Sequence, residues 1–268
     1  EVSEGVRTPK INIPELVLAM DSTDALTEIR MLQGVGRAAG LVKLARKRAV
    51  VPTGGINRRS FNWTYAMQIA HEHFDVRRFM LDFKIFDEAD TGSIVADLAL
   101  LRPDVISVHS LAGGAAMRGA VENKNISRIA AHTIDSRTTN AECRTVHGLN
   151  RTSRVLRLAE LAVSNGADIV IAPANDMGTL RCRYPDVTLM ATGAVLPGDD
   201  PRGHEGAMAP SDILEAGADY FVMGRAFAAV THPEDVTNLI VNGNELGLGG
   251  AFGVDFLFAG GAGNGTFS

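Results

Sequence analysis

The sequence predicts an α/β fold of the (β/α)8 or TIM-barrel type, built as a single domain. Eight short runs rich in Val, Ile, Leu and Met are apolar at nearly every position, which is typical of parallel strands covered on both faces. Segments with helical periodicity separate these runs. The chain has 268 residues, a length that one such barrel fills.

The predicted strands are short and are bounded by turn residues. In chain order they comprise residues 16–21, 40–45, 79–84, 104–109, 128–134, 168–173, 188–193 and 220–225. Strand and helix alternating this often favour a closed barrel over an open doubly wound sheet, which usually has fewer strands.

Apolar stripes at helical spacing predict the helices between the strands. Ser22 begins a capping sequence directly after the first strand. Residues 63–74 carry apolar side chains on one face, and residues 155–162 form another stripe. This second stripe stops at Asn165 and Gly166, which predict a helix C-terminus.

Two segments lie outside the strand–helix pattern, so we divide the chain into an arm at residues 1–13, a barrel at 14–241 and a tail at 242–268. The tail holds nine glycines interleaved with Phe and Leu residues. A glycine-rich segment is typical of a flexible extension. Its aromatic residues equally favour packing against the barrel or a partner subunit.

Composition excludes several classes of protein. Lys and Arg number 26 against 31 Asp and Glu, a net charge of −5, which argues against a partner made of nucleic acid and against a polybasic membrane surface. Cys143 and Cys182 are too few for a disulfide scaffold. No apolar stretch reaches the ~18 residues of a membrane helix, and the N-terminus lacks a secretion signal pattern. We therefore expect a soluble, cytoplasmic protein.

Charged residues gather where the predicted strands end, which is where (β/α)8 enzymes place their active sites. Asp21 ends the first strand, Lys43 lies in the second, and Asp82 and Lys84 lie in the third, with Asp87 on the loop that follows. Because side chains alternate along a strand, Asp82 and Lys84 should project to the same side, into the barrel mouth. A structural ion-pair network could explain such an array. Preorganised charges for catalysis explain it better, because this arrangement is costly for structure alone.

A second candidate site lies late in the chain. Barrel phosphate sites usually form from the loops after the seventh and eighth strands. The loop from Gly193 to Gly203 follows the seventh predicted strand, and Arg225 closes the eighth. We predict an anion site here, with a structural surface arginine as the alternative for Arg225. His71 and His73 are two residues apart on a predicted helix and point away from each other, so we expect no metal site.

The residues Asp82-Phe-Lys84-Ile-Phe-Asp87, with Asp90-Thr91 after them, resemble the Asp-x-Lys-x-x-Asp signature of the orotidine 5′-phosphate decarboxylase family. The resemblance extends over all eight strands and includes Asp21, Lys43 and the Gly-Arg pair at Arg225. It implies the barrel fold, decarboxylation of orotidine 5′-phosphate to UMP in pyrimidine biosynthesis, and no cofactor or metal.

The resemblance also implies a role for each matching charged residue. Asp21 and Lys43 would hold the ribose hydroxyls, and Asp82 would lie beside the substrate carboxylate. Lys84 would protonate C6 of the pyrimidine. Asp87 would reach across a homodimer interface into the neighbouring site.

The remaining matches concern the nucleotide. Thr91 would accompany Asp87 across the dimer interface. Ser136 would contact the pyrimidine ring, and Arg225 would bind the phosphate together with the loop at Gly193.

The loop at residues 193–205 departs from the family pattern. Residues 192–197 read Thr-Gly-Ala-Val-Leu-Pro where the family usually has Thr-Pro-Gly-Ile-Arg-Pro, and His204-Glu205 replaces a common Asp-Gln. An acid beside a phosphate is unfavourable. Either Glu205 turns away, or Arg202 compensates for it, or the substrate is not the standard nucleotide. The glycine-rich tail is also atypical.

Three hypotheses follow. The first is the orotidine 5′-phosphate decarboxylase activity. The second is a decarboxylase or aldolase acting on a sugar phosphate, with Lys84 forming an imine or Asp82 binding a metal. The third is a catalytically silent barrel that binds a nucleotide or a partner.

Overall fold

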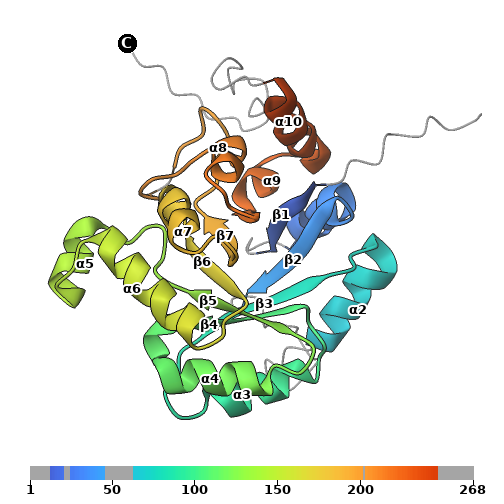
Figure 1. Cartoon of the computed structure of the whole chain (residues 1–268). Helices are drawn as coiled ribbons and strands as arrows, with labels where there is room; N and C mark the ends of the chain where they lie inside the picture. The colour runs from blue at the N-terminus through green and yellow to red at the C-terminus, as the bar shows by residue number, and fades with distance from the viewer. Residues whose placement is uncertain (1–12, 21–24, 46–62, 202, 247–268) are drawn as a thin grey trace, which may run out of the picture.

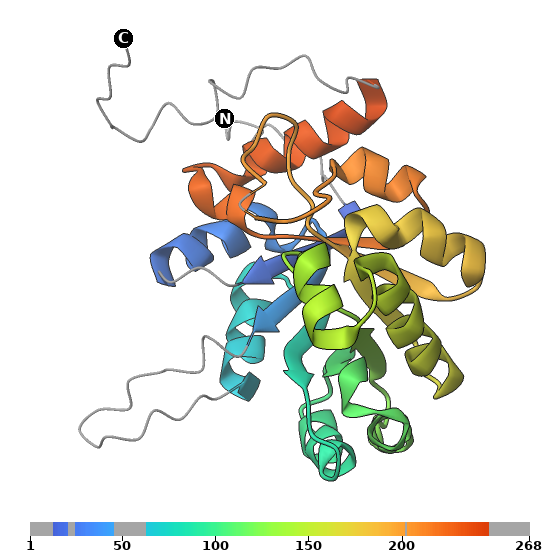
Figure 2. The ribbon, with the colours of Figure 1, turned by 90° about the vertical axis from the view of Figure 1, so that its left-hand side faces the viewer.

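Eight parallel strands close into one barrel, with helices on its outside (Figures 1 and 2). The structure is a computed structural model, and it describes residues 13–20, 25–45, 63–201 and 203–246. Each strand pairs with the next, and β8 pairs with β1. The predicted (β/α)8 fold is confirmed.

The strands of the barrel are β1 (Ile13–Met20), β2 (Ala39–Ala45), β3 (Phe79–Ile85), β4 (Val105–His109), β5 (Arg128–His132), β6 (Ile169–Pro173), β7 (Thr188–Thr192) and β8 (Tyr220–Met223). The helices are α1 (Ala25–Met31), α2 (Trp63–Phe74), α3 (Thr91–Ala99), α4 (Gly114–Asn123), α5 (Asn140–His147), α6 (Arg151–Ser164), α7 (Met177–Arg183), α8 (Pro210–Glu215), α9 (Arg225–Ala229) and α10 (Pro233–Leu246). Short helical turns η1 (Leu32–Gly36), η3 (Ser110–Ala112) and η4 (Ala174–Asp176) adjoin α1, α4 and α7.

The predicted strands all exist, and their ends differ by a few residues. The first strand begins three residues earlier than predicted, at Ile13, and the fifth ends two residues earlier, at His132. The correction that matters for the site concerns the eighth, which ends at Met223 and not at Arg225. Gly224 lies outside the extended region, with φ −147° and ψ −50°, and begins α9. Arg225 is therefore the first residue of a helix, where its backbone N–H lies among the unpaired donors of a helix N-terminus.

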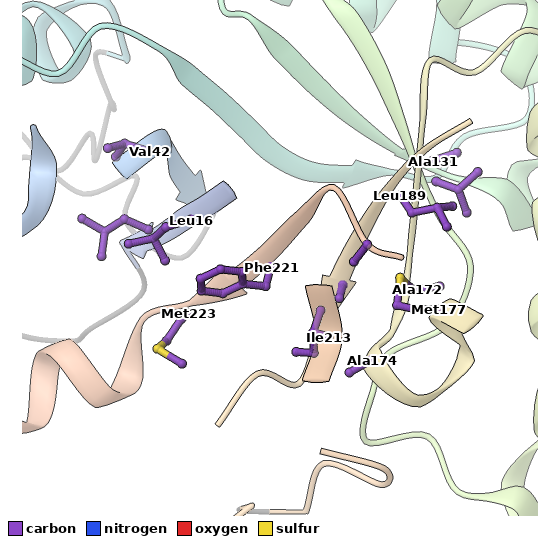
Figure 3. Packing of buried hydrophobic residues seen from close by; sticks show 14 of the residues in the cluster. Leu16, Val42, Ala131, Ala172, Ala174, Met177, Leu189, Ile213, Phe221 and Met223 are labelled. Carbon is purple, nitrogen blue, oxygen red and sulfur yellow. The ribbon is translucent and has the colours of Figure 1, made fainter. Parts of the chain in front are cut away.

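Two layers of apolar side chains form the core. The inner layer fills the barrel and includes Leu41, Met80, Ala130 and Ile171. The outer layer lies between the strands and the helices, and Figure 3 shows part of it. Because side chains alternate along a strand, each strand supplies both layers, which is why the strands are apolar at nearly every position.

Helix α6 shows how the sequence sets a helix against the barrel. The Asn150 side chain accepts a hydrogen bond from the Ser153 N–H and caps the helix. The predicted stripe is buried from Val155 to Ala162. The chain then leaves the helix at Gly166, whose φ of +85° favours glycine.

Strand β1 begins at Ile13, and α10 continues to Leu246. Residues 1–12 and 247–268, and with them most of the expected arm and tail, lie outside the described residues. Among the helices that the structure describes, none has the length and apolar character to cross a membrane.

Candidate active site

A cavity of about 820 Å³ opens at the carboxyl ends of the strands. Apolar side chains of the inner layer, Met80, Ile171 and Met190, form part of its lining. Ionisable side chains from β2, β3 and β5 line one region, and residues after β7 and β8 line another. The volume lies within the range of ligand sites for small molecules.

Asp82 accepts hydrogen bonds from both lysines that we predicted to be catalytic. Its Oδ2 atom accepts a hydrogen bond of 2.9 Å from Lys43 Nζ and one of 2.6 Å from Lys84 Nζ. Asp82 is 3% exposed, so its carboxylate is enclosed by protein. The structure thus brings together three of the four residues that we predicted to be catalytic.

Two further side chains hold the other carboxylate oxygen, and the sequence analysis missed both. Asp82 Oδ1 lies 2.8 Å from Ser107 Oγ, which donates to it, and 2.9 Å from Nε2 of His132. Both partners are buried. His132 lies two residues after Ala130 on β5, so both side chains point into the barrel. Alternation along this strand was therefore the signal that could have placed His132 in the site.

The electrostatic environment keeps the cluster in defined charge states. Burial opposes ionisation of Asp82, but the charges of Lys43 and Lys84 and the hydrogen bond from His132 hold its pKa well below the usual value. Burial, reinforced by Lys84 and Lys43, lowers the pKa of His132 although Asp82 opposes this shift. His132 is therefore neutral near pH 7 and donates Nε2–H to Asp82.

Lys84 has an unusual backbone. Its φ is +48°, in the left-handed region that residues with a side chain rarely occupy. The β3–β4 pairing is irregular between Leu81 and Ile85, and the Lys84 N–H donates to Ser107 Oγ over 2.9 Å instead. Strained backbone of this kind is found at functional sites, where the surrounding structure holds it in place.

The region after β7 and β8 contains the predicted anion-binding residues. Ser136, Gly193 and Arg225 all line the cavity. Gly193 has φ +91°, a conformation that favours glycine. His204 connects the two polar side chains: Nδ1 lies 2.6 Å from Ser136 Oγ, and Nε2 contacts Nη2 of Arg225.

His204 is therefore a cavity residue that the sequence analysis noted only as a departure from the family pattern. Burial, Arg225 and Arg137 lower its pKa. Its hydroxyl and guanidinium partners are far from it in sequence, so no local pattern could have identified the arrangement.

Glu205 turns away from the cavity. Its side chain is exposed and the residue does not line the site. The backbone explains this orientation, because the Glu205 N–H donates to the Ser136 carbonyl over 2.9 Å and its carbonyl accepts from Arg151 Nη2 over 3.3 Å. Of the three explanations offered for this acid, the first is the one the structure supports.

Asp87 and Thr91 do not line the cavity of their own chain. Asp87 Oδ1 accepts from the N–H groups of Ala89 and Asp90, at 2.9 and 2.7 Å, and these bonds lower its pKa. The Thr91 hydroxyl donates to the Asp87 carbonyl. Together these contacts fix the loop that leads into α3.

The other two predicted site residues, Asp21 and Arg202, lie outside the described residues. Among the residues that are described, no group of three or more His, Cys, Asp or Glu side chains could hold a metal ion.

A closed (β/α)8 barrel with a buried lysine–aspartate cluster at its strand ends and an arginine beside a glycine loop defines an enzyme of the barrel class. A profile of the family described as orotidine 5′-phosphate decarboxylase / HUMPS matches residues 14–239. The chain belongs to this family.

Curated relatives agree with this assignment, and a solved structure shares the fold. An orotidine 5′-phosphate decarboxylase of Thermobifida fusca is 34% identical over 158 residues, which cover 57% of this chain and 67% of the relative. One from Psychromonas ingrahamii is 25% identical over 231 residues, covering 83% and 94%. The crystal structure of orotidine 5′-phosphate decarboxylase from Lactobacillus acidophilus matches with a TM-score of 0.66 at 18% identity, covering 85% of this chain and 98% of that one. The last similarity concerns the fold.

Proposed function

We propose that this chain decarboxylates orotidine 5′-phosphate to UMP, a step of pyrimidine biosynthesis. The observation that carries the proposal is the pair of ammonium groups, Lys43 and Lys84, on one oxygen of buried Asp82 inside the cavity. The family membership and the decarboxylases among its relatives support it.

The cavity suggests how the nucleotide lies in the site. The phosphate binds at Arg225 and the loop that begins at Gly193, which line the cavity. Arg202, outside the described residues, is a further candidate from its place in the sequence alone. The pyrimidine ring lies against Ser136. The substrate carboxylate lies beside Asp82, and Lys43 is within reach of the ribose hydroxyls. The family resemblance adds Asp21, which lies outside the described residues, as a further ligand of the ribose.

The chemistry follows from this placement. The bond between C6 and the carboxylate breaks, CO2 leaves, and the electron pair remains on C6. Lys84 stabilises that charge as a cation and then transfers a proton to C6, after which its amine regains a proton from solvent. Asp82 disfavours the starting carboxylate through like-charge proximity and holds Lys84 in place. The reaction requires no cofactor.

We further propose a homodimer in which Asp87 and Thr91 complete the partner's site. Neither residue lines the cavity of its own chain, and Phe86 beside them is 60% exposed, which suits an apolar contact. We also propose that the protein is cytoplasmic, where its proposed substrate, a free nucleotide, would be found.

The alternative of a metal-dependent sugar-phosphate enzyme finds less support. A metal bound through Asp82 would have to displace two ammonium groups from Oδ2, and Oδ1 already has two partners. An imine at Lys84 would require its amine to leave Asp82 and lose its proton.

The test is the loss of orotidine 5′-phosphate followed by ultraviolet absorbance, for the wild type and for Lys84→Ala. We expect the variant to lose about 10²- to 10⁴-fold in kcat, the range of a general acid. Lys124→Ala is the matched control, because Lys124 also forms a carboxylate pair, 2.6 Å from Asp168, but at the amino ends of the strands. Full activity of Lys84→Ala would refute the assignment. Chelator-sensitive activity on a sugar phosphate, or borohydride trapping of a covalent adduct between Lys84 and that substrate, would favour the sugar-phosphate alternative. Tight binding of a 6-substituted UMP without turnover would favour a catalytically silent barrel.

A further inference from the structure

The carboxylate of Asp82 is held from two sides in different ways. Its Oδ2 atom accepts from the two ammonium groups, whereas Oδ1 faces the uncharged donors Ser107 and His132. All four contacts are within 2.9 Å. The two oxygens are therefore not equivalent, and rotation of the carboxylate would break contacts on both sides.

Burial and a ring contact hold His132 in this position. It is the last residue of β5, it is 6% exposed, and its ring stacks on His109 with centroids 6.4 Å apart. His109 is itself fixed, since its Nδ1 accepts from the Leu111 N–H over 3.2 Å. Burial and His132 lower the pKa of His109 to about 4, so this neighbour is uncharged near neutral pH.

The charges around His132 come from three strands. Lys43 on β2 and Asp82 and Lys84 on β3 face it, together with His109 on β4. A neutral His132 leaves the two ammonium groups and one carboxylate as the charged groups of this cluster. Protonation would add a third cation, and Asp82 would then be drawn toward the imidazolium.

We propose that His132 is a positioning residue for Lys84: by donating a neutral hydrogen bond to Asp82 Oδ1, it keeps Oδ2 directed at the two lysines. The proposal rests on the decarboxylase function for its kinetic consequence. Without His132, Oδ1 keeps Ser107 as its donor but loses one hydrogen bond, so the carboxylate becomes more basic and holds the Lys84 ammonium more tightly. Lys84 is then held away from C6 and gives up its proton less readily, so kcat falls while substrate binding at the phosphate end is unchanged.

The experiment compares His132→Leu with His132→Gln. Leucine fills a similar volume without a donor, and glutamine restores a neutral N–H. We expect His132→Leu to lose about 10- to 100-fold in kcat, the effect of one hydrogen bond to a charged group, with KM within about twofold. His132→Gln should recover most of that loss. His73→Gln, an exposed histidine on α2, is the control, and thermal unfolding checks that each variant is folded.

The pH profile separates positioning from a purely structural role. At saturating substrate, the wild-type kcat should fall on acidification, as His132 gains a proton. This fall should occur at a pH below that at which an ordinary histidine titrates, because burial lowers the pKa of His132. His132→Gln cannot take up this proton, so its kcat should remain flat to lower pH. An unchanged acid limb in His132→Gln, or equal kcat in wild type and His132→Leu, would overturn the proposal.

A second measurement does not depend on turnover. In the ligand-free protein, reaction of Lys84 with trinitrobenzenesulfonate, followed by mass spectrometry, reports how tightly Asp82 holds the ammonium. His132→Leu should slow this reaction by about tenfold, and His132→Gln should not. Absence of decarboxylation by the wild type would refute the proposed function, while equal labelling of Lys84 in all variants would refute the positioning role.

Discussion

Replacing Asp82 with asparagine tests the charge cluster, because it keeps the shape of the side chain and removes the charge. The asparagine side chain retains an oxygen that can accept from Ser107 and His132. Its amide group, however, would stand where Oδ2 receives two ammonium groups, so donors would face donors.

The magnitude follows from the burial of the two lysines. Two ammonium groups ~5 Å apart repel by about 3 kcal/mol at an effective dielectric constant of 20. The Lys43 side chain is 12% exposed and cannot escape easily, whereas Lys84, at 42%, can turn toward solvent and be screened. We therefore expect Asp82→Asn to lower the free energy of unfolding by about 3 kcal/mol, at the lower end of the range for breaking a buried ion pair.

The pH dependence gives the sign of the effect. The pKa of Asp82 is well below its usual value in the folded protein. Its contribution to stability is thus complete above about pH 4, the unfolded value, and is lost as the pH falls toward the folded pKa. The difference between wild type and variant should shrink on acidification across that window.

Urea unfolding at several pH values measures this difference, and the ultraviolet assay measures the accompanying loss of turnover. Asp97→Asn, an exposed acid on α3, is the control and should change stability by less than about 0.5 kcal/mol. A variant at Asp82 that unfolds like the wild type at pH 7, or that keeps full activity, would refute the reasoning.

Three further predictions concern the dimer and the loop after β7. Mixing inactive Lys84→Ala and Asp87→Ala protomers should restore about a quarter of wild-type activity if Asp87 acts across the interface, because about half of the dimers are then mixed and each mixed dimer has one intact site. No recovery would place Asp87 in the site of its own chain. His204→Ala should raise KM for orotidine 5′-phosphate about tenfold with little change in kcat, because His204 contacts the phosphate-binding Arg225. A lower kcat with unchanged KM in steady-state kinetics would instead show that the histidine serves the chemistry. Gly206→Ala should also raise KM, because a Cβ there would lie 2.2 Å from the Asn175 side chain at a φ of +70°; unchanged kinetics and unfolding would show that this loop conformation is not required.

The fold could be predicted because its determinants are local. Val, Ile and Leu runs mark every strand, and the stripe that begins at Val155 marks α6 up to its end at Gly166. The strand end at Met223 was missed because Gly224 and Arg225 carry no local pattern that separates a strand from a helix start. Pairing with the neighbouring strands decides that boundary.

The site could be predicted only in part. Strand alternation anticipated that Asp82 and Lys84 would meet, but not the positive φ of Lys84 that accompanies the contact. His132 escaped notice because a single histidine in an apolar strand is usually a core residue. Its meaning depends on Asp82, 50 residues away in sequence.

The sequence by itself determined the eight strands, the family signature around Lys84 and the position of charged residues at strand ends. The tertiary structure decided which atoms meet: Ser107 and His132 on one oxygen of Asp82, the lysines on the other, and His204 between Ser136 and Arg225. Apart from Lys84 and Asp82, which share a strand, these partners are separated by 21 to 68 residues along the chain. Only closure of the barrel brings them together, because neighbouring parallel strands are joined through helices and meet at their carboxyl ends.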